Sequence, residues 1–527
     1  MTTSNTTRIA AAMLTLFAAF AARAGTVGKA SCRAGDKAET GLQGLTTPDE
    51  IASGAAKAGF NCNADIVGQY QGEGASWQLT AWKNCAYFDQ RLNSAEANPG
   101  TVVVDVSDPK NPKPTAYLAE PAFLDPWESL KVNAARQLLA GDQKSNVGFT
   151  IYDISKDCLH PALMSSINIP GMFGHTGQWA PDGNTYYITP LRTDQTIVAV
   201  DTKDPAHPAM IPCAAGSYGC GTNGFFTAPS ADFVTARWHD LEFSKDGNTA
   251  YIAMLGTGTA APGNGLVIMD VSDFQSRKAN PAYRVISQLR WDDGSVGAQN
   301  SLPITIKGKP YILFTDESGG PVAGCSQGKS AAGFPRLIDI SDPKNPVTAS
   351  KLILDIHDPA NCTVAATTPV TNATVTNGNT SSAPFGFSCH YCNVDDVDNA
   401  KIAACNCFAA GLRIFDISNA SAPKEIAYLK PGAQGTKVLP GSQYANTAAP
   451  TFVRNFDWAT SKPSFPKDRG MASGDLWTTT QDNGFMVVKL DTGGGGGGCA
   501  TADASLGGLI AFWLTQMFRR RRLRSRV

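Results

Sequence analysis

The chain has 527 residues, of which 43% are hydrophobic and 17% charged, and this composition suits a globular protein long enough for one large core or two domains. Without the two terminal segments described below, residues 1–24 and 493–527, Lys plus Arg falls from 44 to 36 and Asp plus Glu from 45 to 44. The rest of the chain, called the body here, therefore has a net charge of about −8. This negative charge argues against nucleic acid as a partner.

Residues 1–24 have the pattern of a secretory signal peptide. Arg8 precedes an apolar stretch from Ile9 to Phe20, and the segment ends in the small-x-small motif Ala22-Arg23-Ala24. The apolar stretch is too short to span a bilayer, which disfavours a membrane-anchoring first helix. We therefore expect an exported protein whose mature chain begins near Gly25.

Residues 25–59 are rich in Gly, Ala and Thr and show no sustained periodicity. We expect this segment to be an irregular lead-in that is tied to the rest of the protein through Cys32. The repeated part of the chain follows it, from residue 60 on.

A repeated motif first occurs at Thr101–Pro112, with the sequence Thr-Val-Val-Val-Asp-Val-Ser-Asp-Pro-Lys-Asn-Pro. Each copy is a β-branched run closed by Asp, then a turn, then a second apolar run, which predicts an antiparallel hairpin. Further copies lie at Phe149–Ser155, Thr196–Thr202, Leu266–Ser272, Arg336–Pro346 and Leu412–Ser418, and a degenerate seventh lies at Phe485–Leu490. Because the Asp recurs from copy to copy, we expect it to bind the following turn and to have no catalytic role.

The spacing of the motif predicts the architecture. Its aspartates fall at positions 105, 153, 201, 270, 339 and 416, and the shortest step of 48 residues suits a four-stranded blade of a β-propeller, with loop insertions in the longer copies. A second pair of strands precedes the motif, as in His175–Thr189 and His239–Ala253, where Asp-Gly-Asn separates two apolar runs. These pairs are the inner strands of each blade, and the motif supplies the outer strands.

The last copy of the motif lacks its second strand, because Phe485–Leu490 runs directly into glycines. Asn63–Tyr70 resembles the missing strand and precedes the first blade, so an amino-terminal strand would complete the last blade and remove an exposed sheet edge. We therefore predict an all-β fold in which residues 60–492 form one seven-bladed β-propeller and not two domains.

Residues 493–527 have the pattern of a membrane stop signal. Six glycines, Gly493 to Gly498, precede Cys499, an apolar stretch from Leu506 to Phe518 and an arginine-rich end. The positive-inside rule leaves the arginines in the cytoplasm and everything upstream exported. The apolar stretch is short for a bilayer, which suits a transient anchor in the inner membrane.

This tail resembles carboxyl-terminal sorting signals of the GlyGly-CTERM kind, in their cysteine-bearing variant. The resemblance implies that a membrane protease removes the tail and that the protein moves to the cell surface or outer membrane of a Gram-negative bacterium. It makes Cys499 the candidate for sorting or lipid attachment. An envelope or surface partner is then expected.

Several stretches of the body also resemble a known family. Val102–Val106 and Leu266–Asp270 resemble the repeat of LVIVD-repeat proteins. Further stretches resemble a larger exported bacterial group that carries this repeat, namely Glu39–Gly44, Pro126–Val132, His390–Cys392, Gly411–Ile417 and Glu425–Tyr428. The resemblance covers roughly residues 30–490 and implies a propeller fold and export, but no particular activity.

Histidine is rare, with six residues in the chain, so its placement is informative. His175, His239 and His390 each open the innermost strand of a blade, and Glu128 holds the equivalent position in the second blade. Equivalent positions lie at one height around the channel, where three imidazoles and a carboxylate are a plausible ligand set for Cu, Zn or Fe. The corresponding positions elsewhere are near Gln299 and at Asn455 or Asp457. The alternative is that a polar residue opens each strand only to satisfy backbone groups.

Twelve cysteines lie in the body, and an even number in an oxidising compartment predicts disulfides. Cys389-His-Tyr-Cys392 and Cys405-Asn-Cys407 resemble a zinc site, but residues 389 and 392 of a regular strand point to opposite faces. Disulfides are therefore favoured over a metal at these four residues. The preferred pairs are Cys392 with Cys405, Cys62 with Cys85, and Cys213 with Cys220.

Two functions of different classes remain open. One is a surface-sorted binding or scaffold module, and the other is a metal-dependent redox enzyme centred in the channel. Methanethiol oxidases of the selenium-binding protein family are seven-bladed propellers with metal-binding histidines, but this is an analogy of fold. The chain has no Gly-x-Ser-x-Gly elbow, P-loop or dinucleotide fingerprint, so hydrolase, NTPase and dehydrogenase functions lose their usual support.

Overall fold

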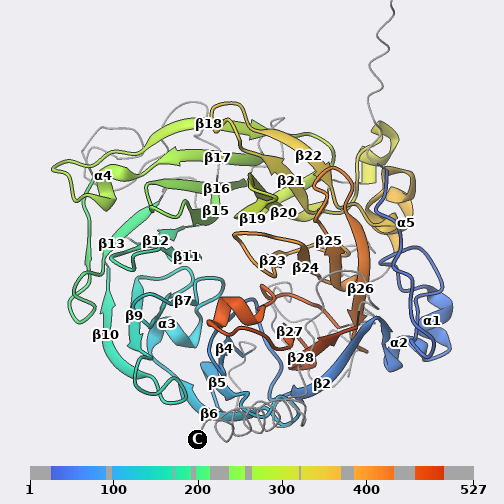
Figure 1. Cartoon of the computed structure of the whole chain (residues 1–527), viewed down its shortest axis with the longest axis horizontal. Helices are drawn as coiled ribbons and strands as arrows, with labels where there is room; N and C mark the ends of the chain where they lie inside the picture. The colour runs from blue at the N-terminus through green and yellow to red at the C-terminus, as the bar shows by residue number, and fades with distance from the viewer. Residues whose placement is uncertain are drawn as a thin grey trace, which may run out of the picture.

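The protein is described by a computed structural model. It describes residues 25–90, 98–169, 172–190, 197–213, 237–255, 264–319, 322–368, 385–432 and 457–491. Their strands form seven sheets arranged as a ring around a central channel, with β7, β11, β15, β19 and β23 nearest the centre (Figure 1). The predicted all-β, seven-bladed propeller is confirmed.

Five blades consist of four antiparallel strands in chain order from the inside outward. They are β3 (Leu79–Trp82), β4 (Cys85–Asp89), β5 (Thr101–Asp105) and β6 (Lys113–Leu118); β7 (Lys131–Asn133), β8 (Leu138–Asp142), β9 (Gly148–Asp153) and β10 (Ala162–Asn168); β11 (Thr176–Trp179), β12 (Thr185–Thr189), β13 (Val198–Asp201) and β14 (Ala209–Met210); β15 (Arg237–Phe243), β16 (Thr249–Leu255), β17 (Gly265–Asp270) and β18 (Arg284–Arg290); and β19 (Ser295–Ile306), β20 (Lys309–Gly319), β21 (Arg336–Asp339) and β22 (Val347–Lys351). Their α-helices and 3₁₀ segments are short connections: α3 (Pro121–Leu124), α4 (Ser272–Gln275), η1 (Val322–Gln327), η2 (Asp355–His357), η3 (Pro359–Asn361) and α5 (Cys362–Thr367).

The repeated aspartates bind the turns that follow them, as the sequence predicts. Asp105 Oδ1 accepts hydrogen bonds from the backbone N–H of Ser107 at 2.8 Å and from its hydroxyl at 2.6 Å. Asp153, Asp270, Asp339 and Asp416 accept the same backbone bond from the serine two residues later. An Asx turn therefore sets the hairpin between the two outer strands, which is a structural role.

The core lies between neighbouring blades. Between the fourth and fifth blades, for example, Ala253 and Ile268 of one sheet pack with Ile312 and Phe314 of the next, all fully buried. The middle strands therefore bury both of their faces, which explains their nearly continuous apolar runs.

The amino terminus closes the ring at two blades. In the seventh blade, β2 (Ala64–Tyr70) pairs with β28 (Gly484–Leu490), which pairs with β27 (Leu476–Thr480), so the predicted closing strand is confirmed. The sixth blade contains β23 (Tyr391–Val394), β24 (Ile402–Cys407), β25 (Gly411–Asp416) and β26 (Lys424–Lys430), and it gains β1 (Phe60–Cys62) as a fifth, outermost strand. With three residues, β1 is too short to show a periodic pattern in the sequence.

The inner side of the seventh blade is less regular than that of the others. Among the residues described there, from 457 on, single bridges join Ala459 to Thr480 and Ser464 to Trp477 instead of a full strand, and η4 (Pro466–Arg469) follows. These bridges hold residues 459–464 against β27 at the channel wall.

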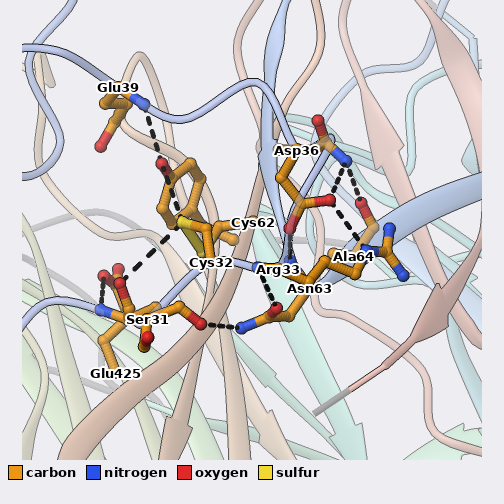
Figure 2. The surroundings of a disulfide bond; sticks show 12 residues. Ser31, Cys32, Arg33, Asp36, Glu39, Cys62, Asn63, Ala64 and Glu425 are labelled. Atoms are coloured by element: carbon orange, nitrogen blue, oxygen red, sulfur yellow. Dashed lines mark hydrogen bonds and ion pairs between the residues drawn. A yellow bond between two sulfur atoms is a disulfide. The ribbon is translucent and has the colours of Figure 1, made fainter. Parts of the chain in front are cut away.

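The lead-in folds against the sixth blade. It forms α1 (Pro48–Ala52) and α2 (Ala55–Ala58), and α1 begins with a capping box between Thr47 and Glu50. Figure 2 shows the disulfide between Cys32 and Cys62, which ties the lead-in to β1. Thus the tie through Cys32 is confirmed, although the lead-in is more ordered than the sequence pattern predicts.

The predicted pairing of Cys62 with Cys85 is wrong. Cys62 lies in β1 at the outer edge of the sixth blade, whereas Cys85 lies in β4 of the first blade and pairs with Cys158. The seventh blade separates the two positions (Figure 1). The error arises because the sequence does not reveal that the chain crosses to the sixth blade before it begins the first.

The cysteines around residue 400 form disulfides, as predicted. Cys392 and Cys405 face each other on β23 and β24 and are bonded, and Cys389 is bonded to Cys407. Cys325 and Cys362 form a further pair that the sequence did not suggest. Cys220 and Cys499 lie outside the described residues, as do both predicted export and sorting segments. Within the described ranges, no helix is long and apolar enough to cross a membrane.

A buried ionic cluster holds the lead-in on the sixth blade. The Glu39 carboxylate accepts hydrogen bonds from Arg413 Nη2 at 2.5 Å and from Lys430 Nζ at 3.1 Å, and its side chain is only 5% exposed. Burial would raise the pKa of Glu39, but the charges of Arg413 and Lys430 lower it to about 2. Glu39 is therefore an ion that stabilises the fold.

This cluster predicts an acid-sensitive contribution to stability. Because the pKa of Glu39 falls from 4.5 to about 2 on folding, its contribution is present above pH 4.5 and is lost as the pH falls through 2. Between pH 4.5 and 2 we expect the wild type to lose up to about 3 kcal/mol of its free energy of unfolding through this group. A Glu39→Gln variant lacks the carboxylate and should not show this loss. Urea unfolding at several pH values measures this, with Glu120→Gln, outside the cluster, as the control. An unchanged pH dependence in Glu39→Gln would contradict the assignment.

Candidate metal centre in the channel

Three of the four predicted ligands meet where the innermost strands begin. Glu128 precedes β7, His175 precedes β11 and His239 lies within β15, so three consecutive blades each contribute one side chain. A backbone bridge joins Glu128 to Thr176, and the N–H of Glu128 donates to the carbonyl of His175 at 3.3 Å. The two strand starts are therefore held at the same height in the channel.

The side-chain atoms of these three residues point at one another. His175 Nε2 and His239 Nε2 each lie 3.4 Å from Glu128 Oε2, and the two nitrogens lie 3.2 Å apart. All three residues are buried, with exposed fractions of 2% for Glu128, 7% for His175 and 2% for His239. Glu128 Oε2 has no hydrogen-bond partner among the described residues.

Two β-bulges position side chains in this layer. The register between β15 and β16 shifts between Trp238 and Leu241, next to His239. The register between β19 and β20 shifts between Ala298 and Asn300, at Gln299. Such bulges re-aim a side chain that a regular strand would direct elsewhere.

His390 lies on the other side of the same carboxylate. Its Nε2 is 2.9 Å from Glu128 Oε1 and 2.8 Å from Gln299 Nε2, and its Nδ1 contacts the carbonyl oxygen of Thr460. Among the described residues, the set of ligand atoms within 4.8 Å of one another contains Glu128, His175 and His239 and does not extend to His390. Three imidazoles therefore surround the Glu128 carboxylate, and the four predicted ligands do not share a single point.

Glu317, whose Oε2 lies 3.6 Å from His390 Nε2, was not among the predicted residues. It is on β20, the second strand of the fifth blade, whereas the repeat aligns residues at the start of the first strands. Asp457, the candidate in the seventh blade, instead accepts hydrogen bonds from the backbone N–H groups of Asp482 and Asn483. Asn455 lies outside the described residues.

The electrostatics of the layer favour the ligand forms of these groups. Burial lowers the pKa of His239 to about 3, so its imidazole is neutral at neutral pH. Burial would raise the pKa of Glu128, but the surrounding imidazoles hold it well below its usual range. A neutral imidazole and a carboxylate are the protonation states that bind metal ions.

Aromatic side chains cover one side of the layer. The Trp77 ring lies 5.4 Å from the His390 ring and 5.0 Å from the Trp127 ring, and Phe408 lies 4.9 Å from His390. Trp127 in turn lies 6.0 Å from His175. These rings are buried and exclude water from that side of the carboxylate.

A small cavity of about 140 Å³, lined by both polar and apolar groups, lies further along the innermost strands. Lys131, Gln178 and Asn393 line it, and each follows Glu128, His175 or His390 by three residues. Lys131 Nζ donates to the backbone carbonyl of Glu128 at 3.0 Å, so the cavity adjoins the layer directly. Lys462, also in the lining, pairs with Glu242 at 2.8 Å. The side chains of Glu128, His175 and His239 do not themselves line the cavity.

The other three histidines have structural or surface roles. His160 and His207 are exposed and pair with Asp157 and Asp204, three residues earlier. His357 is fully buried, and its Nε2 contacts the carbonyl oxygen of Phe387 at 2.8 Å. The histidines that gather in the channel are thus the three predicted from the sequence, His175, His239 and His390.

The model of the LVIVD repeat matches residues 246–282 and 406–429. The first match contains β17 with its Leu-Val-Ile-Met-Asp run, and the second spans β25 and most of β26. The chain is an LVIVD-repeat β-propeller. None of the curated proteins matches this LVIVD-repeat chain in sequence.

Similar solved structures are remote. The β-propeller domain of Cps50 (Swd1) from Myceliophteria thermophila is 9% identical, with a TM-score of 0.44, covering 79% of this chain and 97% of that chain. Hydrazine synthase from Kuenenia stuttgartiensis is 12% identical, with a TM-score of 0.39, covering 67% of this chain and 77% of that chain. A putative 6-phosphogluconolactonase from Bacteroides fragilis is 11% identical, with a TM-score of 0.39, covering 71% and 82%. The fold assignment therefore rests on the strand pairing of the LVIVD-repeat chain itself.

Proposed function

We propose that this LVIVD-repeat propeller is a metalloprotein that binds a divalent transition metal through Glu128, His175 and His239. The observation that carries the proposal is the buried Glu128 Oε2, which lacks a hydrogen-bond partner among the described residues and faces two imidazole nitrogens at 3.4 Å. A buried carboxylate oxygen without a partner is costly, and a cation between the three atoms removes that cost.

The distances support a metal of ordinary coordination length. With ligands at 2.0–2.1 Å, neighbouring ligand atoms of a tetrahedral ion lie about 3.3 Å apart. The three separations here are 3.2, 3.4 and 3.4 Å. Three protein ligands leave a position for water or substrate, as in catalytic sites, whereas structural zinc sites use four.

The reaction class depends on the ion. Two imidazoles and a carboxylate suit Zn, Cu or Fe, so bound Cu or Fe would support the redox enzyme and Zn would support Lewis-acid chemistry. A small substrate could approach from the cavity that lies three residues further along the innermost strands. The aromatic rings on the opposite side keep the ion away from bulk water.

The propeller fold also suits a binding or scaffold module, and no specific activity is shown. We propose export to the cell surface or outer membrane by the sorting route that the tail resembles. That route would involve a membrane protease, a transient inner-membrane anchor and an envelope partner. The disulfides are consistent with an exported protein.

Metal content of the folded protein tests the proposal. The purified mature chain is stripped with a chelator, reloaded separately with Zn²⁺, Cu²⁺ or Fe²⁺ and analysed for bound metal. We expect at least one ion per chain, and a loss of affinity of at least about 100-fold in a His175→Ala, His239→Ala double variant.

The matched control is a His160→Ala, His207→Ala double variant, because both of these histidines are exposed and lie outside the channel. Circular dichroism checks that both variants remain folded. A wild-type protein without stoichiometric metal, or equal uptake by the two double variants, would overturn the proposal.

A further inference from the structure

The cavity along the innermost strands is a ligand site that the metal centre does not use. Residues of β3, β7, β11 and β23 line its volume of about 140 Å³, together with residues 462–464 and 468. Ala134, which also belongs to the lining, is exposed, so the cavity opens to solvent there. Since a cavity of about 150 Å³ holds benzene, this one has room for a molecule of about six non-hydrogen atoms.

A buried acceptor in the lining lacks a partner. Gln78 is only 1% exposed, and its Oε1 has no hydrogen-bond partner among the described residues. Its Nε2 donates to the backbone carbonyl of Glu128 at 3.4 Å. Because a carbonyl only accepts, this contact fixes which end of the amide carries the nitrogen and leaves the oxygen for another donor. A buried amide oxygen without a donor is costly, and a ligand that donates to it removes that cost.

Lys131 places a hydrogen-bond donor next to this acceptor. Its Nζ donates to the same Glu128 carbonyl at 3.0 Å, so the amine and the Gln78 amide are neighbours. Asp240 Oδ2 lies 4.0 Å from Nζ, beyond hydrogen-bond length. A lysine carries more than one N–H whether or not it is protonated, so Lys131 keeps a donor for a ligand in either state. A hydroxyl group at this point accepts from Lys131 and donates to Gln78 Oε1.

The charges of the lining favour a neutral ligand. Lys462 pairs with Glu242 Oε1 at 2.8 Å, and Lys131 faces Asp240. Each lysine thus has a carboxylate of its own, and no surplus of positive charge attracts an anion into the cavity. The Lys462 ammonium has three donors, so it also keeps N–H groups for a ligand.

We propose that this cavity binds a small neutral polyol, with one hydroxyl group between Lys131 and Gln78 and a second beside Lys462. The carbon atoms of a polyol suit the apolar part of the lining, to which Leu79 and Val132 belong. The inference goes beyond the proposed function and requires no bound metal, because the three metal ligands do not line the cavity.

Binding of glycerol, a triol of the expected size, tests the inference. Ligand-observed nuclear magnetic resonance measures its affinity for the mature chain stripped of metal. We expect saturable binding, and a loss of affinity of at least about tenfold in Lys131→Met and in Gln78→Leu, each of which removes a partner of the same hydroxyl group. Lys309→Met is the matched control and should bind like the wild type, because Lys309 pairs with Asp339 and is 49% exposed.

A substitution at the opening separates loss of the site from loss of the fold. Ala134 is exposed, so Ala134→Phe should leave the circular dichroism spectrum unchanged while its ring obstructs the cavity. We expect this variant to lose glycerol binding. Ala135→Phe is its control, because Ala135 is exposed at the next position but does not belong to the lining. Equal affinity of the wild type and Ala134→Phe would place the bound glycerol elsewhere and overturn the inference.

The remaining outcomes concern the ligand class and the metal. Lactate has the size of glycerol but carries a negative charge, so tighter binding of lactate would overturn the neutral class. Absence of saturable binding would show that the cavity holds only water, and it would overturn the inference. Zinc content is measured on the same preparations after reloading. A chain that binds zinc but not glycerol overturns this inference alone, and one that binds glycerol but not zinc overturns the proposed function alone.

Discussion

Replacement of Arg413 by methionine is expected to destabilise the folded protein by about 3–5 kcal/mol. Arg413 is fully buried, and its guanidinium donates to Glu39 at 2.5 Å, to Glu425 at 3.1 Å and to the carbonyl of Ala410 at 2.7 Å. Methionine removes the positive charge but leaves both carboxylates buried. The cost arises more from leaving two buried carboxylates, which keep Lys430 at Glu39 and the Gln43 amide at Glu425, than from the lost attraction.

Urea unfolding at neutral pH measures the effect. The matched control is Arg284→Met, because Arg284 also contacts two aspartates but is 47% exposed, so its loss should cost less than about 1 kcal/mol. A Glu39→Gln, Arg413→Met double variant should be less destabilised than the sum of the single variants. Equal losses in Arg413→Met and Arg284→Met would contradict the interpretation of the cluster.

Removal of the Cys32–Cys62 disulfide is expected to cost about 3–4 kcal/mol, as for a loop of this length in the unfolded chain. The two cysteines are 30 residues apart, and their bond fixes the lead-in to β1. Figure 2 shows that the surrounding contacts depend on this segment: Asn63 Nδ2 donates to the Ser31 carbonyl, and the Asn63 N–H donates to Asp36. The Cys32→Ser, Cys62→Ser variant should loosen both contacts.

Hydrogen exchange distinguishes a local effect from a general one. The control is Cys325→Ser, Cys362→Ser, which opens a loop of similar separation, 37 residues, between η1 and α5. Both variants should lose similar stability, but only the first should lose protection in β1 and β2. Unchanged protection of these two strands in the first variant would show that the disulfide does not secure the closure.

The ring could be predicted from the sequence because its signal is local and repeated. The β-branched run that ends at Asp105, with its copies, marks the outer strands of the blades, and the count of these runs gave the blade number and the missing strand. The fifth strand of the sixth blade could not be predicted, because Phe60–Cys62 has no period and its partner lies more than 360 residues away.

The candidate site was predictable in part for a similar reason. His175, His239 and Glu128 occupy equivalent positions in successive blades, so the repeat aligned them. Glu317 lies on a second strand, and its approach to His390 depends on side-chain direction, which the repeat does not encode. Which oxygen of the Glu128 carboxylate each imidazole faces also depends on the exact positions of the side chains. No sequence pattern specifies those positions.

The pairing of β2 with β28 also determines when the propeller can finish folding. Tyr70 in β2 pairs with Phe485 in β28, and Ala64 pairs with Leu490. Strand β2 is made early in synthesis, so it cannot pair until β28 has been made. During synthesis and export, β2 has an unpaired edge until the final blade emerges, and its loop closure spans most of the chain. Folding of the ring therefore ends only when residues 484–490 arrive, and a chain that stops short of them leaves β2 without its β28 partner.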